Sequence, residues 1–239
     1  MPNAPDRAAE PHIVRTNGRH AESGPLIYSG PLSMFGAKAE MAALEKGIAH
    51  RVAFVPFDMK GLYVPKPEIT RRINPKQEVP LLVHGDLEIF DSTQIFEYLE
   101  DIAPSPPLWP GDPQARARAR LMELRSDEVF FPNVVTCMPR RRQQAGEDAY
   151  GRAVGRIAAF YEETDAQLEG RDYLETTFSF ADIAFYSAMF FARFLGQPPA
   201  EDMARLAGWR TRMAARPAVR DVMGAMAAWL TASGIPADI

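Results

Sequence analysis

The sequence has a single cysteine, Cys137, among its 239 residues. One cysteine excludes an internal disulfide and any Cys-x-x-Cys redox pair. Thiol chemistry would therefore need Cys137 acting alone or a thiol brought in by a substrate. We expect Cys137 itself to be a small buried hydrophobic residue, as free cysteines commonly are.

Long apolar runs and an excess of basic residues are also absent. The most apolar segment, residues 178–195, is interrupted by Asp182 and Arg193, whereas a membrane-spanning helix needs roughly 18 to 20 consecutive apolar residues. The formal net charge of −4 and the pI near 5.7 do not favour nucleic-acid binding, because such domains are usually strongly basic. We therefore expect neither a membrane nor a nucleic acid as partner.

Two further absences concern the start of the chain and metal ions. The first two dozen residues contain no apolar run, so they lack the hydrophobic region of a secretory signal and predict a disordered tail over residues 1–24. No set of His, Asp and Glu residues has the spacing of metal ligands, and His84 stands at a predicted hairpin tip. We expect a cytoplasmic protein that holds no metal.

From residue 25 to residue 102, strand and helix signals alternate. The first strand, helix and second strand follow one another closely, which favours a right-handed βαβ unit, and His84-Gly85-Asp86 between two apolar runs indicates a β-hairpin. The order βαβ, α, ββα predicts a thioredoxin-like α/β domain over residues 25–102. The predicted strands are 26–29, 52–56, 79–83 and 87–90, and the predicted helices are 34–46, 68–73 and 92–101.

Residues 103–111 are dense in proline and predict a semi-rigid linker, because proline cannot continue a helix. Strand signals vanish after it, so residues 112–239 predict an all-helical domain that begins with Asp112 as N-cap and Pro113 at the first helical position. Ser179 and Asp182 have the spacing of a capping box before a buried helix. The predicted helices run from 113 past 131 with a bend at Pro132, then over 149–168, 180–191 and 217–234, with Tyr161 expected at the solvent margin.

Four segments of the chain, taken together and in this order, resemble the glutathione transferase family over nearly all of residues 25–230. The resemblance implies a thioredoxin-like half that binds glutathione as co-substrate and a helical half that shapes a pocket for a second, apolar substrate. The four segments are Ser33 to Lys38 leading to Leu44 to Ile48, Asn74 to Pro80, Asp91 to Leu99, and Ser179 to Ile183.

The resemblance implies that glutathione lies on Val79, Pro80, Asp91 and Ser92. The family has a cis bond where Val79–Pro80 stands, which turns the Val79 backbone toward the cysteinyl unit of glutathione. From Pro80 alone, a trans proline opening an edge strand is the favoured interpretation, and the surrounding motifs reverse that preference. Ser92, at a helix N-terminus, would bind the γ-glutamyl carboxylate, and Asp91 would bind the ammonium. Asp91 could alternatively act only as a helix cap, with Gln94 completing a capping box.

Ser33 is the candidate catalytic residue. It stands at the start of the first helix, where serine-type and cysteine-type members of the family place the residue that faces the glutathione sulfur. Its hydroxyl would donate a hydrogen bond to the thiolate and lower the thiol pKa; alternatively it is a plain N-cap. Met34 departs from the family, which often has proline after the catalytic residue, and Tyr28 is the rival hydroxyl, although its strand position favours a packed core residue.

We therefore expect a glutathione transferase that activates the glutathione thiol for attack on an apolar electrophile. One alternative is a specialised reaction at the same site, such as reductive dehalogenation, ether cleavage or isomerisation. The other is a non-catalytic protein that binds glutathione or hydrophobic ligands, and Met34 and Asp91 keep that alternative open. The resemblance also implies a homodimer and a second-substrate pocket lined by Phe35, Phe131, Val134 and Met138.

Overall fold

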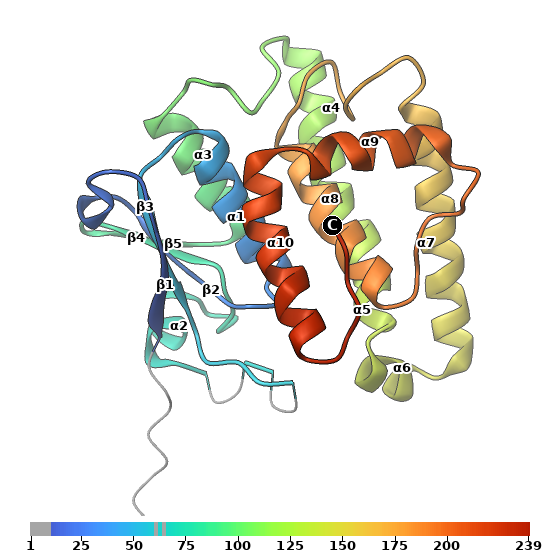
Figure 1. Cartoon of the computed structure of the whole chain (residues 1–239), viewed down its shortest axis with the longest axis horizontal. Helices are drawn as coiled ribbons and strands as arrows, with labels where there is room; N and C mark the ends of the chain where they lie inside the picture. Colours follow the sequence, from blue (N-terminus) through green and yellow to red (C-terminus); the bar gives the residue numbers. More distant parts are fainter. Residues whose placement is uncertain (1–10, 60–61, 64–65) are drawn as a thin grey trace, which may run out of the picture. The chain divides into compact units, whose positions relative to one another are not determined.

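The computed structural model describes residues 11–59, 62–63 and 66–239. The chain divides into two compact units, Met1–Ser105 and Pro106–Ile239, coloured blue to green and green to red in Figure 1. The division lies inside the proline-dense stretch 103–111. In the described ranges, the helices are too short or too polar to cross a membrane.

The N-terminal unit contains a mixed sheet whose described strands have the order β1-β3-β2-β4-β5. Strands β2 and β3 run parallel and the other neighbouring pairs run antiparallel. The βαβ unit and the hairpin are those that the sequence predicts, so the thioredoxin-like fold class is confirmed. The strands are β1 (His12–Asn17), β2 (Leu26–Ser29), β3 (His50–Phe54), β4 (Leu81–His84) and β5 (Leu87–Phe90), and the helices are α1 (Met34–Glu45), α2 (Glu68–Ile73) and α3 (Ser92–Ile102).

The two faces of this sheet have different coverings. Helices α1 and α3 pack against each other and against the sheet (Figure 1). Ser29 of β2 faces α1, because a Cβ built on Gly36 of α1 would meet the Ser29 Oγ. Side chains alternate along a strand, so Tyr28 points to the opposite face. There it lines an open hollow of about 360 Å³ with Ala53 of β3 and Ile69 of α2.

Strand β1 corrects the prediction of a disordered tail over residues 1–24. It pairs antiparallel with β3, from His12 opposite Phe54 to Asn17 opposite His50, and a short 3-10 turn at Ala21–Ser23 leads on to β2. Its sequence, HIVRTN, is hard to recognise as a strand because four of its six residues are polar. Residues 1–10 of the predicted tail lie outside the described residues.

A buried ion pair fastens β1 to the first helix. The Arg15 Nη2 donates to the Glu40 Oε2 of α1 at 2.6 Å, the Arg15 Nε also pairs with that carboxylate, and the guanidinium lies 5.3 Å from the centre of the Phe54 ring. The Glu40 side chain is only 1% exposed, whereas that of Arg15 is 26% exposed. The strand therefore neutralises a carboxylate that the helix alone would bury without a partner.

We expect Arg15→Gln to lower the free energy of unfolding by about 2 to 3 kcal/mol, because removing one member of a buried pair leaves the other charge uncompensated. Arg51→Gln is the matched control, since Arg51 of β3 is equally exposed, at 25%, but pairs with Glu22, which is 82% exposed. Its loss should stay near 0 to 1 kcal/mol, the usual range for an exposed pair. Urea unfolding of both variants is the measurement, and equal losses would contradict a special role for the Arg15–Glu40 pair.

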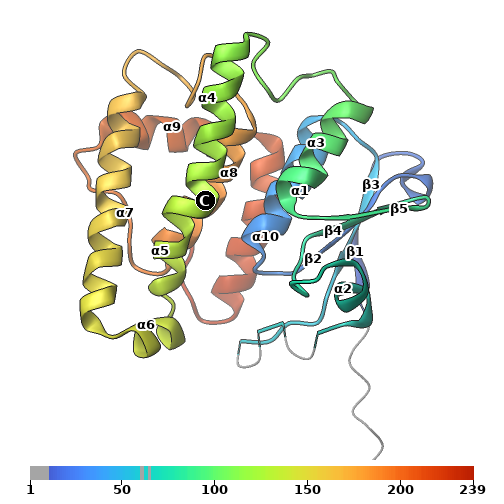
Figure 2. The same cartoon turned by 180° about the vertical axis from the view of Figure 1, so that it is seen from behind.

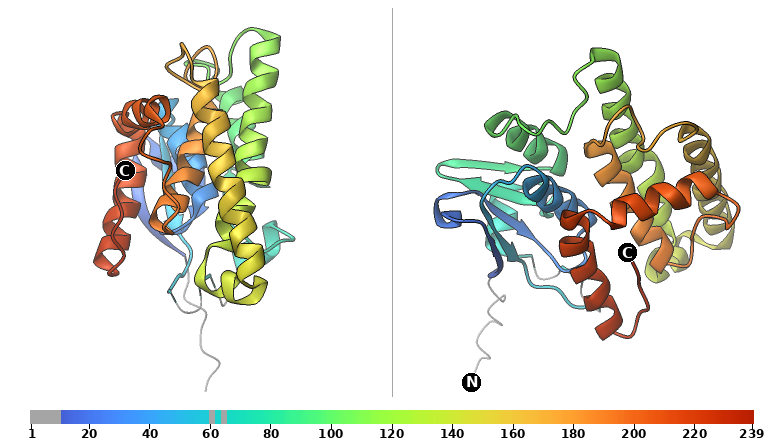
Figure 3. Two further views of the ribbon diagram at one scale, coloured as in Figure 1. Left: turned by 90° about the vertical axis from the view of Figure 1, so that its right-hand side faces the viewer. Right: turned by 45° about the horizontal axis from the view of Figure 1, so that its top comes forward.

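The second unit is helical, and part of the predicted linker packs onto it. The Leu108 carbonyl accepts from the Phe180 N–H at 2.9 Å, and the Trp109 ring meets the Phe180 ring edge-on at 5.9 Å. Helix α7 runs beside the α4–α5 helix (Figures 2 and 3). The helices are α4 (Pro113–Leu124), α5 (Phe131–Thr136), α6 (Pro139–Ala145), α7 (Glu147–Gln167), α8 (Phe180–Phe194), α9 (Ala204–Ala214) and α10 (Pro217–Ala232).

A π-helical turn, Arg125–Phe130, joins α4 to α5. Pro132 is the second residue of α5. Because a proline inside a helix lacks an N–H and clashes with the carbonyl four residues earlier, the regular α-helical hydrogen bonds are interrupted there and replaced by the wider π-helical turn. The sequence predicts a bend at Pro132, and the structure has this irregular turn just before it. The turn directs Phe130 into the core, where its ring lies 5.0 Å from that of Phe160 and 5.3 Å from that of Phe185.

Tyr161 corrects another expectation. It is 1% exposed rather than at the solvent margin, its ring lies 5.3 Å from that of Phe130, and its hydroxyl donates to the Gln197 carbonyl at 3.0 Å. Burial raises its pKa. A tyrosine with a buried ring and one acceptor for its hydroxyl behaves as a core residue.

Candidate functional site

The strand register places three predicted site segments at one end of the sheet. Tyr28 of β2 pairs with Leu81 of β4, and Leu81 pairs with Phe90 of β5. One step further along these antiparallel strands come Ser29, Pro80 and Asp91. The turn before α1, the Val79–Pro80 bond and the start of α3 therefore leave neighbouring strands at the same end of the sheet.

Ser33 is the N-cap of α1. Its Oγ accepts a hydrogen bond from the Gly36 N–H at 3.0 Å, and its own N–H donates to the Gly30 carbonyl at 3.2 Å in the turn that precedes the helix. The cap uses only the oxygen's acceptor capacity, so the hydroxyl proton remains able to donate. The first turn of α1 carries no acidic residue, so the partial positive charge of the helix N-terminus is not offset there.

Gly36 and Ser29 belong to this arrangement, and the sequence analysis did not identify either as a site residue. A Cβ on Gly36 would lie 1.9 Å from the Ser29 Oγ and 2.9 Å from the Ser33 Oγ, distances that packed atoms do not adopt. Only glycine lets α1 approach the end of β2 so closely. The glycine three residues after Ser33 is the signal that could have revealed this.

Tyr63 is a further residue that the sequence analysis missed. Its ring covers the turn before α1, because a Cβ on Gly30 would lie 2.5 Å from the Tyr63 Oη, and it packs against Phe57 with ring centres 4.7 Å apart. Burial raises the pKa of the Tyr63 phenol, and the backbone of Leu32 opposes that shift. The turn that presents Ser33 is thus held from the side by an aromatic ring.

Tyr28, the rival to Ser33, lies on the other face of the sheet. It lines the hollow beside α2, whereas Ser29, the next residue, faces Gly36 of α1. Burial raises the pKa of Tyr28, with Arg51 and Arg72 opposing that shift. A phenol whose pKa is raised and that points away from α1 is poorly placed to ionise a thiol at the N-terminus of that helix.

Asp91 and Ser92 begin α3. The Asp91 Oδ1 accepts from the N–H groups of Thr93 at 3.0 Å and Gln94 at 3.3 Å, so this carboxylate caps the helix. The backbone of Asp91 has φ 76°, a left-handed value that costs a non-glycine residue about 1 to 3 kcal/mol. Ser92 is buried at the first helical position. The first turn itself carries no acidic residue, so the Asp91 cap is the negative charge that partly offsets the positive end of the helix dipole there.

Asp91→Asn separates the cap from the charge. Asparagine tolerates a positive φ and caps helices about as well as aspartate, so we expect the free energy of unfolding to change by less than about 0.5 kcal/mol. The KM for glutathione should rise about 2- to 5-fold, the range for an exposed ion pair. Asp91→Ala, in contrast, should also destabilise the protein by about 1 kcal/mol. Thermal unfolding and glutathione titration of both variants check this, and an unchanged KM in Asp91→Asn would exclude an ammonium contact.

The Val79–Pro80 bond is cis. Both residues precede Leu81, the first residue of β4, which pairs with Tyr28. Close by, the Asn74 Nδ2 donates to the Glu78 carbonyl at 2.8 Å, which holds the loop that leads into the bond.

The four second-substrate candidates lie on both units. Phe35 belongs to α1 of the N-terminal unit and is half-buried. In the helical unit, Phe131 and Val134 are buried on α5, and the Phe131 ring lies 5.8 Å from that of Phe191. Met138, just after α5, is half-buried. Phe131 and Val134 thus belong mainly to the packed interior.

The other residues that the sequence analysis considered have ordinary surroundings. Cys137 is buried, its Sγ lies 3.4 Å from the Asn133 carbonyl, and burial raises its pKa, which disfavours a reactive thiolate. The His84 Nδ1 lies 2.6 Å from the Tyr98 hydroxyl. Within residues 11–59, 62–63 and 66–239, no three His, Cys, Asp or Glu side chains gather closely enough to hold a metal ion.

Curated relatives share parts of this chain. The stringent starvation protein A homolog of Coxiella burnetii is 35% identical over 106 residues, 44% of this chain and 47% of that protein. The chain thus spans about half the length of that relative. The protein LigF of Sphingobium sp. is 28% identical over 226 residues, 74% of this chain and 84% of that protein.

Solved structures and domain models agree with the fold. The theta class glutathione S-transferase of Xanthomonas axonopodis pv. citri, solved with glutathione bound, superposes with a TM-score of 0.68 at 22% identity, over 84% of this chain and 97% of that one. The sequence model of the glutathione S-transferase N-terminal domain matches residues 27–107, and that of the C-terminal domain matches residues 122–217. Since both domains match in order, the chain belongs to the glutathione transferase family.

Proposed function

We propose that this protein is a glutathione-dependent transferase that ionises the glutathione thiol and directs it at an apolar electrophile. The observation that carries the proposal is the shared strand end at which Ser29, Pro80 and Asp91 lie side by side in register. Two helix N-termini start from that end, each with a serine at its first residues, and that of α3 is also capped by the Asp91 carboxylate. Such an arrangement suits a ligand that brings an anionic group to each N-terminus and a cationic group to Asp91.

In this proposal each segment has a separate role. The N-terminus of α3 binds the γ-glutamyl carboxylate through the Ser92 N–H and hydroxyl, and the Asp91 carboxylate, whose Oδ1 takes both capping bonds, offers Oδ2 to the ammonium. The backbone of Val79 pairs with the cysteinyl unit as an added strand would. The sulfur then lies at the N-terminus of α1, where Ser33 donates to it.

The chemical step needs a thiolate near neutral pH. A free thiol has a pKa of about 8.5, and a hydrogen-bond donor together with a helix N-terminus lowers it. The Ser33 Oγ already accepts the Gly36 N–H, and this bond polarises the hydroxyl and strengthens it as a donor. Phe35 of α1, and Phe131, Val134 and Met138 of the helical unit, are kept as the residues proposed for the second substrate. The proposal keeps the cytoplasmic homodimer that the resemblance implies.

A non-catalytic binding protein is the second candidate. Asp91 is engaged as a helix cap, and Met34, which stands where proline often follows the catalytic residue, is buried at the start of α1. Retention on immobilised glutathione, followed by turnover of a panel of aryl halides, enals, epoxides and hydroperoxides, separates the two candidates. Retention with turnover is expected, and retention without turnover of any compound would favour the binding protein.

Ser92→Ala should raise the KM for glutathione about 10- to 100-fold, the equivalent of one hydrogen bond to a charged group, about 1.5 to 3 kcal/mol. The contact is remote from the sulfur, so it is made equally in the ground and transition states and kcat should change little. Steady-state kinetics with varied glutathione is the measurement. Thr93→Ala, on the next residue of α3, is the control that should leave KM near the parent value. A normal KM in Ser92→Ala would remove Ser92 from the site.

A further inference from the structure

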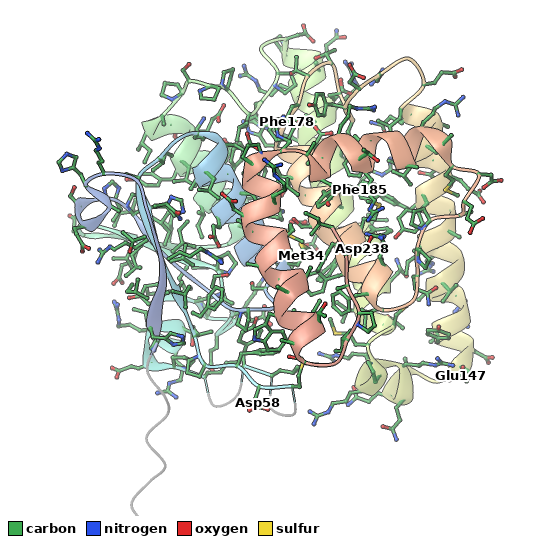
Figure 4. The ribbon with its side chains drawn as sticks, in the orientation of Figure 1. Met34, Asp58, Glu147, Phe178, Phe185 and Asp238 are labelled. Atoms are coloured by element: carbon green, nitrogen blue, oxygen red, sulfur yellow. The ribbon has the colours of Figure 1, made fainter. Side chains whose placement is uncertain are left out.

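A second polar cluster lies in the helical unit and contains none of the residues discussed above as glutathione contacts. After α10 the chain turns back, and residues 235–239 run along α8, with Asp238 labelled there in Figure 4. Arg193 of α8 and Arg210 of α9 converge on the Asp238 carboxylate. The Arg193 Nη2 lies 2.7 Å and 2.9 Å from its two oxygens, and the Arg210 Nη2 lies 2.7 Å from Oδ2.

The two guanidinium groups hold more of this segment than one carboxylate. Arg193 Nη1 donates to the Asp238 carbonyl at 3.1 Å, and Arg210 Nη2 donates to the Ile239 carbonyl at 2.7 Å. The two guanidinium groups thus share the Asp238 carboxylate and the main-chain oxygens of Asp238 and Ile239. Hydrogen bonding of this kind, with two planar donors around one oxyanion, is the geometry by which proteins recognise carboxylates and phosphates.

Asp238 does not use all the donors at this place. The Tyr186 side chain is 98% buried, being 2% exposed, and its hydroxyl has no hydrogen-bond partner among the described residues; the same holds for the Arg210 Nε. Burial raises the Tyr186 pKa to about 12, and Arg210, Arg193 and Asp238 are the charges that act on it. Within the described part of the chain, the Tyr186 hydroxyl and the Arg210 Nε are therefore buried donors that Asp238 leaves without an acceptor, as buried polar groups seldom are.

A small hollow lies against Arg193 and Asp238. It has a volume of about 90 Å³ and is lined by Phe190, Phe194, Pro198 and Pro236, together with Arg193 and Asp238. The Asp238 side chain is 73% exposed, so water and ions reach it and its ion pairs are weak. An external anion can therefore reach this carboxylate and compete with it for the two guanidinium groups.

We propose that Arg193 and Arg210, beside Tyr186, form an oxyanion-binding site of the helical unit that the chain's own Asp238 fills, and that a carboxylate or phosphate from outside takes its place. The shared chemistry is an oxyanion held by two guanidinium groups, with the adjoining hollow accepting a small apolar group. The external source is either an acidic peptide segment or a small free anion. This site is independent of the proposed glutathione chemistry.

Calorimetric titration at low ionic strength tests the proposal with two probes, an N-acetylated peptide that copies residues 235–239 and inorganic phosphate. The proteins are the parent, full-length Asp238→Asn, and a form that ends at Ile235, which keeps the Ile235 N–H bond to the Leu230 carbonyl that closes α10. Removing the resident carboxylate should strengthen binding of at least one probe about ten-fold or more. Peptide binding alone identifies a peptide source, and phosphate binding identifies a small anion.

Two further variants make the test specific. Adding Arg193→Gln to Asp238→Asn should abolish the gained affinity, whereas adding Arg212→Gln should not, because Arg212 lies on the same helix α9 as Arg210 but pairs with Asp172. The proposal is overturned if Asp238→Asn binds neither probe more tightly than the parent, or if the Arg193 variant retains the gain. The full-length substitution keeps the test valid even if the shortened chain fails to fold.

Discussion

Replacing Asp182 by alanine is expected to lower the free energy of unfolding by more than about 4 kcal/mol. The carboxylate lies at the start of α8 and is fully buried. Its Oδ1 accepts the Leu174 N–H at 2.9 Å and the Trp209 indole N–H at 2.8 Å, and its Oδ2 accepts the N–H and the hydroxyl of Ser179 at 2.9 Å and 3.1 Å. Alanine would leave all of these donors buried without an acceptor, each N–H costing about 1 to 3 kcal/mol.

Urea unfolding of the parent and Asp182→Ala measures this loss. Asp112→Ala is the matched control, because Asp112 caps α4 through one bond to the Ala115 N–H at 2.8 Å and is exposed. Its loss should be about 1 kcal/mol, the usual value for an N-cap. If the two variants lose the same amount, the buried network around Asp182 contributes no more than an ordinary cap.

The same carboxylate has a pH signature. Burial raises the Asp182 pKa to about 6, and the bonds from Leu174, Trp209 and Ser179 oppose that shift. Since the folded pKa lies above the ordinary value of about 3.9, the folded state holds the proton more tightly. This contribution to stability is complete below about pH 4 and is lost as the pH rises through about 6.

Asp182→Asn isolates this effect, because the amide cannot ionise and every other carboxyl is common to both proteins. The parent should lose stability relative to Asp182→Asn by roughly 3 kcal/mol between about pH 4 and pH 7. Urea unfolding at several pH values gives the difference. If the free energy of unfolding of the parent instead rises relative to that of Asp182→Asn as the pH rises, the four hydrogen bonds to the carboxylate outweigh the effect of burial on its pKa.

The thioredoxin-like fold could be predicted because its signals are local. Each signal determines the conformation of residues close to it in the sequence. Such signals are the apolar runs of the strands, Gly47 at the end of α1 and the His84-Gly85-Asp86 turn. Strand β1 could not be predicted in this way, since its Arg15 side chain is stabilised by Glu40, 25 positions away. Tyr161 was misplaced for a similar reason, because its acceptor, Gln197, stands on a distant loop. Helices α6 and α9 were missed as well. Helix α6 is short and has no buried residue, whereas α9 has Leu206, Trp209 and Met213 at helical spacing, a signal that the sequence analysis overlooked.

The candidate site was predictable in its segments but not in its geometry. Capping at Ser33 and Asp91 follows from residue type and position, and both caps are present. The sequence could not decide between Ser33 and Tyr28, because that choice depends on which face of β2 meets α1. The close approach at Gly36 decides it, since Ser29 faces the helix and the alternation of side chains turns Tyr28 away.

Ser33→Ala is expected to raise the pKa of bound glutathione toward the free-thiol value of about 8.5 and to lower kcat near neutral pH about 10- to 100-fold. Each unit of that shift corresponds to about 1.4 kcal/mol. The loss should shrink as the pH rises, because alkaline solution ionises the thiol without help. The measurements are the ultraviolet absorbance of the bound thiolate against pH and the rate with one good electrophile.

Three controls separate the hydroxyl's roles. Ser33→Thr keeps both the donor and the cap, so it should restore most of the activity, whereas Ser33→Ala also removes the acceptor of the Gly36 N–H and should cost about 1 kcal/mol of stability. Tyr28→Phe should leave the titration unchanged. Ser33→Cys should gain mixed-disulfide exchange with glutathione at the expense of conjugation, because a thiol there can attack and be attacked at sulfur.

The outcomes distinguish three assignments of the thiol-activating group. If the pKa of the bound thiol changes in Ser33→Ala alone, Ser33 is the residue that stabilises the thiolate. The close approach of Gly36 to the Ser29 and Ser33 hydroxyls favours this outcome. A change in Tyr28→Phe and not in Ser33→Ala would mean that glutathione binds on the α2 face of the sheet, against the register argument. If neither variant changes the thiol pKa, the helix N-terminus alone sets it, and the non-catalytic candidate becomes the better account because its only requirement is binding.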